Sequence, residues 1–216
     1  MLLINPSASS VDWNSRIAAT QALVVEHDLT TVETTKRNDA TALASQAAED
    51  GFEAVVVLGG DGTLNEAANG LIGSQTALAA LPGGSTNVFA RTIGMAPKTN
   101  RAAPQLQAAL ARGDAVRSFS LGTVSASDDP TTRRHFLFHL GVGYDAAVVA
   151  QVERRAALKR KIGQAIFVYS SFSTYLRHYD HRKPSFAIDF PDGSSVEDGF
   201  FTICLNTNPY TYLGRR

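Results

Sequence analysis

The segment from Val55 to Glu66 has the composition of a phosphate-binding turn. A β-branched run stops at Gly59-Gly60-Asp61-Gly62, and a helical pattern follows it. Three glycines within four residues let the backbone turn sharply and approach a ligand closely. The amides at a helix start lie at the positive end of the helix dipole, so they suit phosphate. We therefore predict that Gly59, Gly60 and Gly62 line a nucleotide site.

Asp61 lies in the middle of this predicted anion site. A bare carboxylate there would repel phosphate, so it makes sense if it binds Mg²⁺ or takes a proton from an attacking hydroxyl. The sequence suggests no structural role for Asp61, whereas Thr63 and Glu66 also match a helix capping box. No lysine follows the glycines, so this is not a Walker A loop. The pattern predicts phosphoryl transfer from a nucleotide.

A second glycine-rich turn covers residues 82–87, Pro-Gly-Gly-Ser-Thr-Asn. Ser85, Thr86 or Asn87 could simply cap the next helix, which is the structural alternative. If this turn follows a strand next to the first loop, it becomes half of a nucleotide crevice. Ser85 could then donate a hydrogen bond to a phosphate or to the edge of a base.

The elements that must position these turns alternate along the first half of the chain. Strands are predicted at 2–5, 29–34, 54–58 and 77–81, and helices at 12–26, 39–50, 63–71, from about 88, and at 101–112. This order predicts a mainly parallel, Rossmann-like sheet with helices on both faces. Ligands bind beyond the carboxyl ends of such strands. Asn5, Thr34, Gly59 and Pro82 follow strand ends, so we expect them to line one crevice.

After about Val116 the pattern changes to alternating strands. We predict strands at 116–127 and 135–141 around a polar turn at 128–132, helices at 146–158 and 163–177, and strands at 185–190 and 200–206 joined through a turn at 191–193. The predicted domains are therefore an α/β nucleotide-binding domain at 1–115 and an incomplete β-sandwich domain at 116–216. Because the strand pattern stops at 211–216 without a capping element, we expect the chain to be a fragment.

Taken together, these motifs resemble the diacylglycerol kinase catalytic domain, the family of bacterial diacylglycerol kinases, sphingosine kinases and related lipid kinases. The resemblance is specific over about residues 1–95 and looser beyond them. Its motifs are Asn5-Pro6, residues 34–40, Gly59–Thr63 with Asn65-Glu66 and Asn69-Gly70, the 82–87 turn, and Gly141-Val142-Gly143-Tyr144-Asp145. Val88 stands where many bacterial relatives have an acid, so a polar contact is lost there.

The resemblance implies transfer of the γ-phosphoryl of ATP, with Mg²⁺, to the hydroxyl of a lipid such as diacylglycerol or a sphingoid base. It implies that Asp61 acts near the metal and the acceptor hydroxyl, and that the acceptor lipid binds between the two domains. The residues implied to line the ATP site are Asn5, Pro6, Ser7, Thr34, Gly59, Gly60, Gly62, Thr63, Glu66, Gly84 and Ser85.

The bulk composition narrows the location and the partners. Lys and Arg number 20, as do Asp and Glu, so no strong field favours nucleic acid. The single cysteine, Cys204, fits a reducing compartment, and neither a signal peptide nor an apolar run of about 20 residues is visible. We expect a cytoplasmic protein whose partners are an acceptor lipid and transiently a membrane surface, with a homodimer left open.

Two alternatives stay open at this point. NAD kinases and phosphofructokinases also carry Gly-Gly-Asp-Gly, although Asn65-Glu66, Asn69-Gly70 and the 82–87 turn argue against them. A non-catalytic nucleotide- or lipid-binding module is the second alternative. A basic cluster of Arg154, Arg155 and residues 159–161 is either a solvated helix face or a site for phosphates or lipid headgroups.

Overall fold

The computed structural model describes residues 1–113, 116–126, 129–154, 173, 179 and 182–212. These form two compact units, one of Met1–Phe138 with Asn206–Arg216 and the other of His139–Leu205. We refer to them as unit 1 and unit 2. The functional division into domains at 1–115 and 116–216 stays a prediction.

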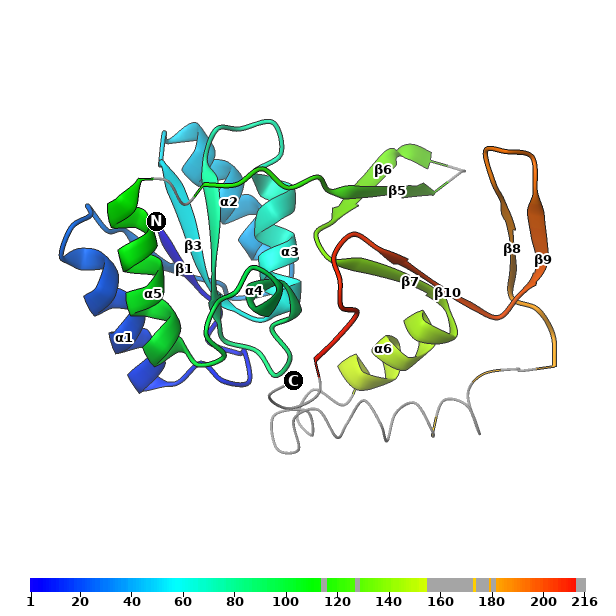
Figure 1. The fold of residues 1–216 in the computed structure, drawn as a ribbon, viewed down its shortest axis with the longest axis horizontal. Coiled ribbons are helices and arrows are strands. Elements are labelled where there is room, and N and C mark those ends of the chain that lie inside the picture. The colour runs from blue at the N-terminus through cyan, green and yellow to red at the C-terminus, as the bar shows by residue number, and fades with distance from the viewer. Residues whose placement is uncertain (114–115, 127–128, 155–172, 174–178, 180–181, 213–216) are drawn as a thin grey trace. The chain divides into compact units, whose positions relative to one another are not determined.

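Unit 1 is built on a parallel sheet of four strands in the order β2-β1-β3-β4 (Figure 1). The strands are β1 (Leu2–Ile4), β2 (Thr31–Glu33), β3 (Ala54–Gly59) and β4 (Ala77–Pro82). β3 pairs with β4 over its whole length, from Ala54 opposite Ala77 to Gly59 opposite Pro82. The predicted parallel sheet is confirmed, and its central strands are apolar because both of their faces are covered.

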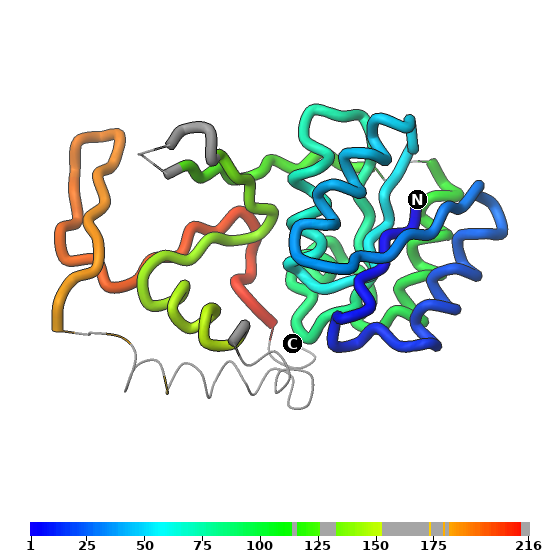
Figure 2. The backbone as a smooth tube through the Cα atoms, turned by 180° about the vertical axis from the view of Figure 1, so that it is seen from behind, coloured from blue at the N-terminus to red at the C-terminus, as the bar shows by residue number. Residues whose placement is uncertain are grey.

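Helices cover the two faces of this sheet as two separate layers. α1 (Trp13–Val24) and α5 (Thr99–Arg112) lie side by side on one face, as Figure 2 shows from behind, and α2 (Asp39–Glu49) and α3 (Asp61–Gly70) cover the other. Because side chains alternate along a strand, Val55 and Val57 pack with α2 and α3, while Val56 and Leu58 pack with α1 and α5. A short helix, α4 (Val88–Thr92), follows β4.

The helix ends follow from local chemistry. Asp12 caps α1, because its carboxylate accepts the Ser15 amide at 2.7 Å while the Ser15 hydroxyl accepts the Asp12 amide at 2.8 Å. The hydrogen bond from the Ser15 backbone is the main cause that lowers the pKa of Asp12. α5 ends at Arg112 and is followed by the C-cap Gly113, whose φ of 70° suits glycine.

Two predictions for the second half are wrong. The first strand there is β5 (Gly122–Ala126) rather than 116–127, and it pairs antiparallel with β6 (Asp129–Phe136), which takes up most of the predicted turn at 128–132. Thr131 and Thr132 are β-branched and suit a strand, and Pro130 is tolerated near a strand start. Both strands belong to unit 1.

The second error concerns the turn at 191–193. It leads from β8 (Phe186–Asp189) into β9 (Ser195–Gly199), which pairs with β8, whereas β10 (Phe201–Leu205) pairs with β7 (His139–Gly143). Gly193 has a φ of 85°, which suits a tight reversal. The sequence of β9 is polar and mostly exposed, so its strand character was hidden.

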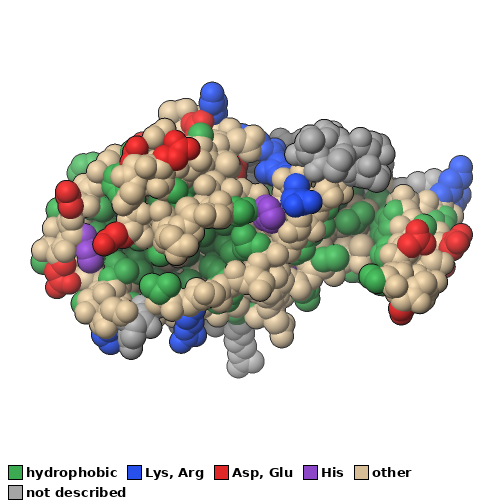
Figure 3. Space-filling model, turned by 90° about the horizontal axis from the view of Figure 1, so that it is seen from above, with side chains coloured by type: hydrophobic (Ala, Val, Ile, Leu, Met, Phe, Trp, Pro, Cys, Tyr) green, Lys and Arg blue, Asp and Glu red, His purple; other side chains and the backbone are tan. Residues whose placement is uncertain are grey.

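Unit 2 also contains α6 (Tyr144–Arg154), which starts two residues before the helix predicted at 146–158. The predicted helix at 163–177 and the basic residues at 155 and 159–161 lie outside the described residues, apart from position 173. The fold class, a parallel α/β sheet followed by small antiparallel sheets, is confirmed. No helix within the described part of the chain is long and apolar enough to cross a membrane. Figure 3 shows both acidic (red) and basic (blue) side chains at the surface.

The packing of α2 against α3 generates a prediction. A Cβ on Gly70 would overlap the carbonyl oxygen of Thr41 and lie 3.0 Å from the Ala44 Cβ. We expect Gly70→Ala to lower the free energy of unfolding by about 1–3 kcal/mol, because the helices would be forced apart. Chemical denaturation measures this, with Gly62→Ala as the control, since a Cβ there meets open space. Equal stability of the two variants would contradict the packing argument.

Candidate nucleotide site

The loops predicted to bind the nucleotide meet at the carboxyl edge of the parallel sheet. Each loop continues the backbone ladder of its neighbour: the Asn5 amide donates to Leu58 O at 3.0 Å and the Thr34 amide to Ile4 O at 2.9 Å. The Gly83 amide likewise donates to Gly59 O at 2.8 Å. The structure therefore places the ends of all four strands along one edge, as the strand order requires.

The two glycine-rich loops lie against each other, backbone to backbone. A Cβ on Gly84 would be 2.7 Å from the Gly60 Cα, and one on Gly83 would be 2.9 Å from the Gly59 Cα. A Cβ on Gly59 would approach the Thr63 Cβ at 3.0 Å. Packing between the loops therefore accounts for these glycines without any ligand.

Gly62 differs from the other loop glycines. It lies in the first turn of α3, it is exposed, and a Cβ added there meets nothing within 4 Å. A glycine inside a helix costs up to about 1 kcal/mol relative to alanine, and packing offers no reason for it here. The residue before the helix, Gly60, has no side chain with which to cap it. The start of α3 is thus open to a ligand at Gly62.

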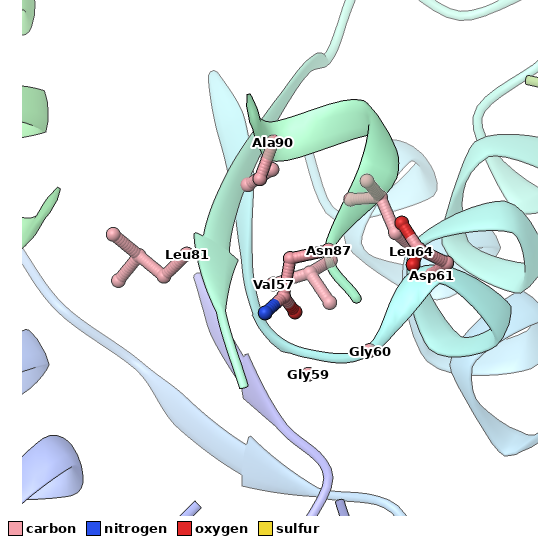
Figure 4. Close-up of a pocket in the computed structure, with 9 residues that line it drawn as sticks. Val57, Gly59, Gly60, Asp61, Leu64, Leu81, Asn87 and Ala90 are labelled. Carbon is pink, nitrogen blue, oxygen red and sulfur yellow. The ribbon is translucent and has the colours of Figure 1, made fainter. Parts of the chain in front are cut away.

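Asp61 is the first residue of α3 and has a structural role that the sequence did not suggest. Its Oδ1 accepts a hydrogen bond from the backbone amide of Phe89, in α4, at 3.2 Å. The carboxylate therefore connects the start of α3 with α4. In Figure 4 Asp61 borders a small pocket with an apolar floor; the lining residues are Val57, Gly59, Gly60, Asp61, Leu64, Ala80, Leu81, Asn87 and Ala90.

Asn87 closes the second loop and was not among the predicted site residues. It is buried in the left-handed conformation, with a φ of 52°. Its Oδ1 accepts the Gly84 amide at 2.7 Å and its Nδ2 donates to Gly84 O at 2.8 Å. Asn87 occupies the N-cap position of α4, as suggested, but its side chain turns back to Gly84 and makes no capping hydrogen bond to the helix. The one available signal is that asparagine tolerates this conformation better than most residues.

Asn5 and Thr63 connect the loop after β1 to α3. The Asn5 Nδ2 donates to the Thr63 hydroxyl at 2.7 Å, and the Asn5 Oδ1 accepts the Ser7 amide at 2.9 Å. The predicted capping box is wrong, because α3 begins at Asp61 and Thr63 lies inside the helix. Pro6 and Ser7 are exposed at the same edge.

The remaining predicted residues are held in different ways. Thr34 is buried, and the loop after it is fixed by the carboxylate of Asp39, which accepts the Thr35 hydroxyl at 2.7 Å. That hydrogen bond is the main cause that lowers the pKa of Asp39. Glu66 is half-buried, and its backbone carbonyl accepts the Thr41 hydroxyl at 2.9 Å. The Ser85 and Thr86 hydroxyl oxygens lie 3.5 Å apart. Nucleotide contact by these side chains stays a prediction.

The two roles of Asn87 can be separated by substitution. Asn87→Ala removes both hydrogen bonds to Gly84 and strains the left-handed backbone, so we expect the free energy of unfolding to fall by about 2–3 kcal/mol. Asn87→Gly removes the same bonds without the strain and should cost about 1 kcal/mol less. Urea denaturation of both variants checks this. Equal losses of unfolding free energy in the two variants would show that the left-handed backbone at residue 87 causes no strain in Asn87→Ala.

Sequence comparison finds similar proteins among bacterial lipid kinases. A diacylglycerol kinase of Bacillus subtilis strain 168 is 41% identical over 71 residues, which are 32% of this chain and 23% of that protein. A probable YegS-like lipid kinase of Chromohalobacter salexigens is 32% identical over 171 residues, 77% of this chain and 50% of that protein. The chain thus spans half the length of these curated relatives or less.

The fold and the family profile point the same way. The crystal structure of a diacylglycerol kinase from Bacillus anthracis strain Sterne superposes with a TM-score of 0.60 at 26% identity, covering 97% of this chain and 64% of that one. The profile described as the diacylglycerol kinase catalytic domain matches residues 1–119, more than half of the 216 residues. The chain belongs to the diacylglycerol kinase catalytic domain family.

Proposed function

We propose that the protein is a lipid kinase that transfers the γ-phosphoryl group of ATP, with Mg²⁺, to a lipid hydroxyl. The observation that carries this proposal is the open start of α3, where Gly62 faces free space beside the carboxylate of Asp61. This open helix start lies at the carboxyl edge of a parallel sheet, where such folds bind their ligands.

The phosphates are the part of the nucleotide that this edge suits best. The amides in the first turn of α3 lie at the positive end of the helix dipole, and no side chain on Gly60 occupies them. Further lining groups in the proposal are Asn5, Pro6, Ser7, Thr34, Gly59, Thr63, Glu66, Gly84 and Ser85.

Asp61 supplies a carboxylate ligand for Mg²⁺. Magnesium is commonly held by one or two carboxylates together with substrate phosphates and water. Within the described residues no group of three or more His, Cys, Asp or Glu side chains could hold a metal, so a metal that arrives with ATP fits better than a protein cage. When bound, Mg²⁺ neutralises charge on the phosphates. The hydrogen bond from the Phe89 amide holds the Asp61 carboxylate in place. In this proposal the carboxylate binds that ion or takes the proton of the acceptor hydroxyl.

The acceptor class in this proposal comes from the relatives, which are named as diacylglycerol and lipid kinases. A lipid with a free hydroxyl, such as diacylglycerol or a sphingoid base, is the corresponding substrate here. A cytoplasmic kinase would have to meet that lipid at a membrane surface.

Asp61→Asn tests the charge at the site without changing its shape. The amide oxygen still accepts the Phe89 hydrogen bond, so we expect the unfolding midpoint to stay the same while phosphoryl transfer falls at least about 100-fold. The measurement is transfer of labelled γ-phosphate from ATP into a total lipid extract with NAD present, partitioned between organic and aqueous phases. Asp50→Asn, at the exposed end of α2, is the control.

The same assay separates the alternatives. Retained phosphoryl transfer in Asp61→Asn would show that the Asp61 carboxylate is not needed for the reaction. Label in the aqueous phase would favour a small-molecule kinase. Mg-ATP binding without transfer, in this chain and in a longer version, would favour a binding module.

Gly62→Ala tests the open helix start. A methyl group there meets no protein atom, so stability should be unchanged or higher by up to about 1 kcal/mol, while a ligand at the helix start would be displaced. We expect the affinity for Mg-ATP, measured by titration calorimetry, to fall at least about tenfold. Unchanged affinity in a stably folded variant would place the phosphates elsewhere.

A further inference from the structure

Two asparagines on α3 bind the backbone at the end of β6, at His135 and at Leu137 just beyond the strand. Asn65 and Asn69 are one helical turn apart, so their side chains lie on the same face. The Asn69 Oδ1 accepts the His135 amide at 3.0 Å and its Nδ2 donates to His135 O at 2.8 Å. The Asn65 Oδ1 accepts the Leu137 amide at 2.8 Å. His135 and Leu137 are two residues apart, and both of their backbone amides are turned toward α3, where the carboxamides accept them.

Leu137 is held by its side chain as well as by its backbone. It is 3% exposed and belongs to the same buried cluster as Leu64 and Ala68 of α3. The chain passes from unit 1 to unit 2 directly after this point, between Phe138 and His139. The outward crossing is therefore attached to the helix that begins at Asp61.

The return crossing is hydrogen-bonded to Leu137 and Phe138, the last residues before the outward crossing. The chain re-enters unit 1 at Asn206, whose Nδ2 donates to Leu137 O at 2.9 Å and to Ser120 O at 2.7 Å. The Asn206 and Thr207 amides donate to Phe138 O at 2.8 and 3.1 Å. Both crossings thus share the backbone of Leu137 and Phe138.

We propose that Asn65, Asn69 and Asn206 form an anchor that holds both crossings against α3 and makes them respond to ligand at the start of that helix. α3 contains ten residues, from Asp61 to Gly70, with the open start at one end and both anchoring asparagines within it. A shift of α3 on ligand binding moves Asn65 and Asn69 with it, and the crossings follow. Asn65 and Asn69 are then positioning residues that act through Leu137 and His135. The response to ATP rests on the proposed function, whereas the anchor itself does not.

Residue-resolved hydrogen exchange of this chain tests the anchor. Asn65→Ala leaves the Leu137 amide without its acceptor, and we expect exchange to quicken about tenfold at Leu137 and also at Asn206 and Thr207. Asn65→Asp keeps the acceptor oxygen but loses the Nδ2 donor to His135 O, so it should restore part of the protection at Leu137. Thr207→Val is the matched control, because the Thr207 hydroxyl is buried without a partner among the described residues. The amides of Val56 and Val57, in the central strand, report whether each variant remains folded.

Hydrogen exchange with and without Mg-ATP distinguishes a positioning role of Asn65 from a purely structural one. In the wild type, Mg-ATP should slow exchange at Asn206 and Thr207, and Asn65→Ala should abolish that slowing while ATP affinity changes less than about twofold. Slowing that persists in Asn65→Ala would overturn the ATP response through Asn65, and quickening confined to Leu137 would overturn the anchor. If the wild type binds no ATP, the proposed function fails, and exchange at the return crossing in the variants alone decides the anchor.

Discussion

The contact that the site depends on is the direct approach of two backbones, Gly59-Gly60 against Gly83-Gly84. β3 and β4 are in register up to Gly59 opposite Pro82, and the ladder continues one step further through the Gly83 amide. At that point neither segment carries a side chain, so the two loops keep the backbone spacing of paired strands. A Cβ on either of the later glycines would fall within 3 Å of the opposite backbone. The start of α3 and the turn before α4 are placed by this contact.

Around this contact, short polar groups convert sheet geometry into the positions of helices. Asn87 fixes its own loop to Gly84, Asp61 accepts the amide of Phe89 in α4, and Asn5 donates to Thr63 in α3. Each uses a side chain of two or three bonds, which leaves little freedom of movement. The helices pack just as closely, since buried alanines dominate α2 where it meets α3. The site is therefore held by many short contacts rather than by a few long ones.

The sequence was sufficient for the parallel sheet and for the position of the loops, because both depend on local periodicity and on turn residues. It failed where a role depends on contacts between distant segments. Nothing near Asp61 indicates that its carboxylate accepts the Phe89 amide, and Thr63 matched a capping box although α3 starts two residues earlier. The strand β9 was missed because an exposed hairpin needs no apolar alternation. Asn65 and Asn69 were recognised as part of a motif, but their partners, His135 in β6 and Leu137 just after it, lie about 70 residues away along the chain.

The spacing of the two asparagines on α3 sets a limit on how this helix can change. Successive residues of an α-helix are rotated by about 100°, because about 3.6 residues complete one turn. One residue inserted or deleted between Gly62 and Asn65 would leave the glycine loop intact and turn both carboxamides away from His135 and Leu137. Substitutions on the exposed side of α3 would leave this geometry unchanged, whereas changes of length would not. The helix is therefore free to vary only on its solvent side, and its phase is fixed.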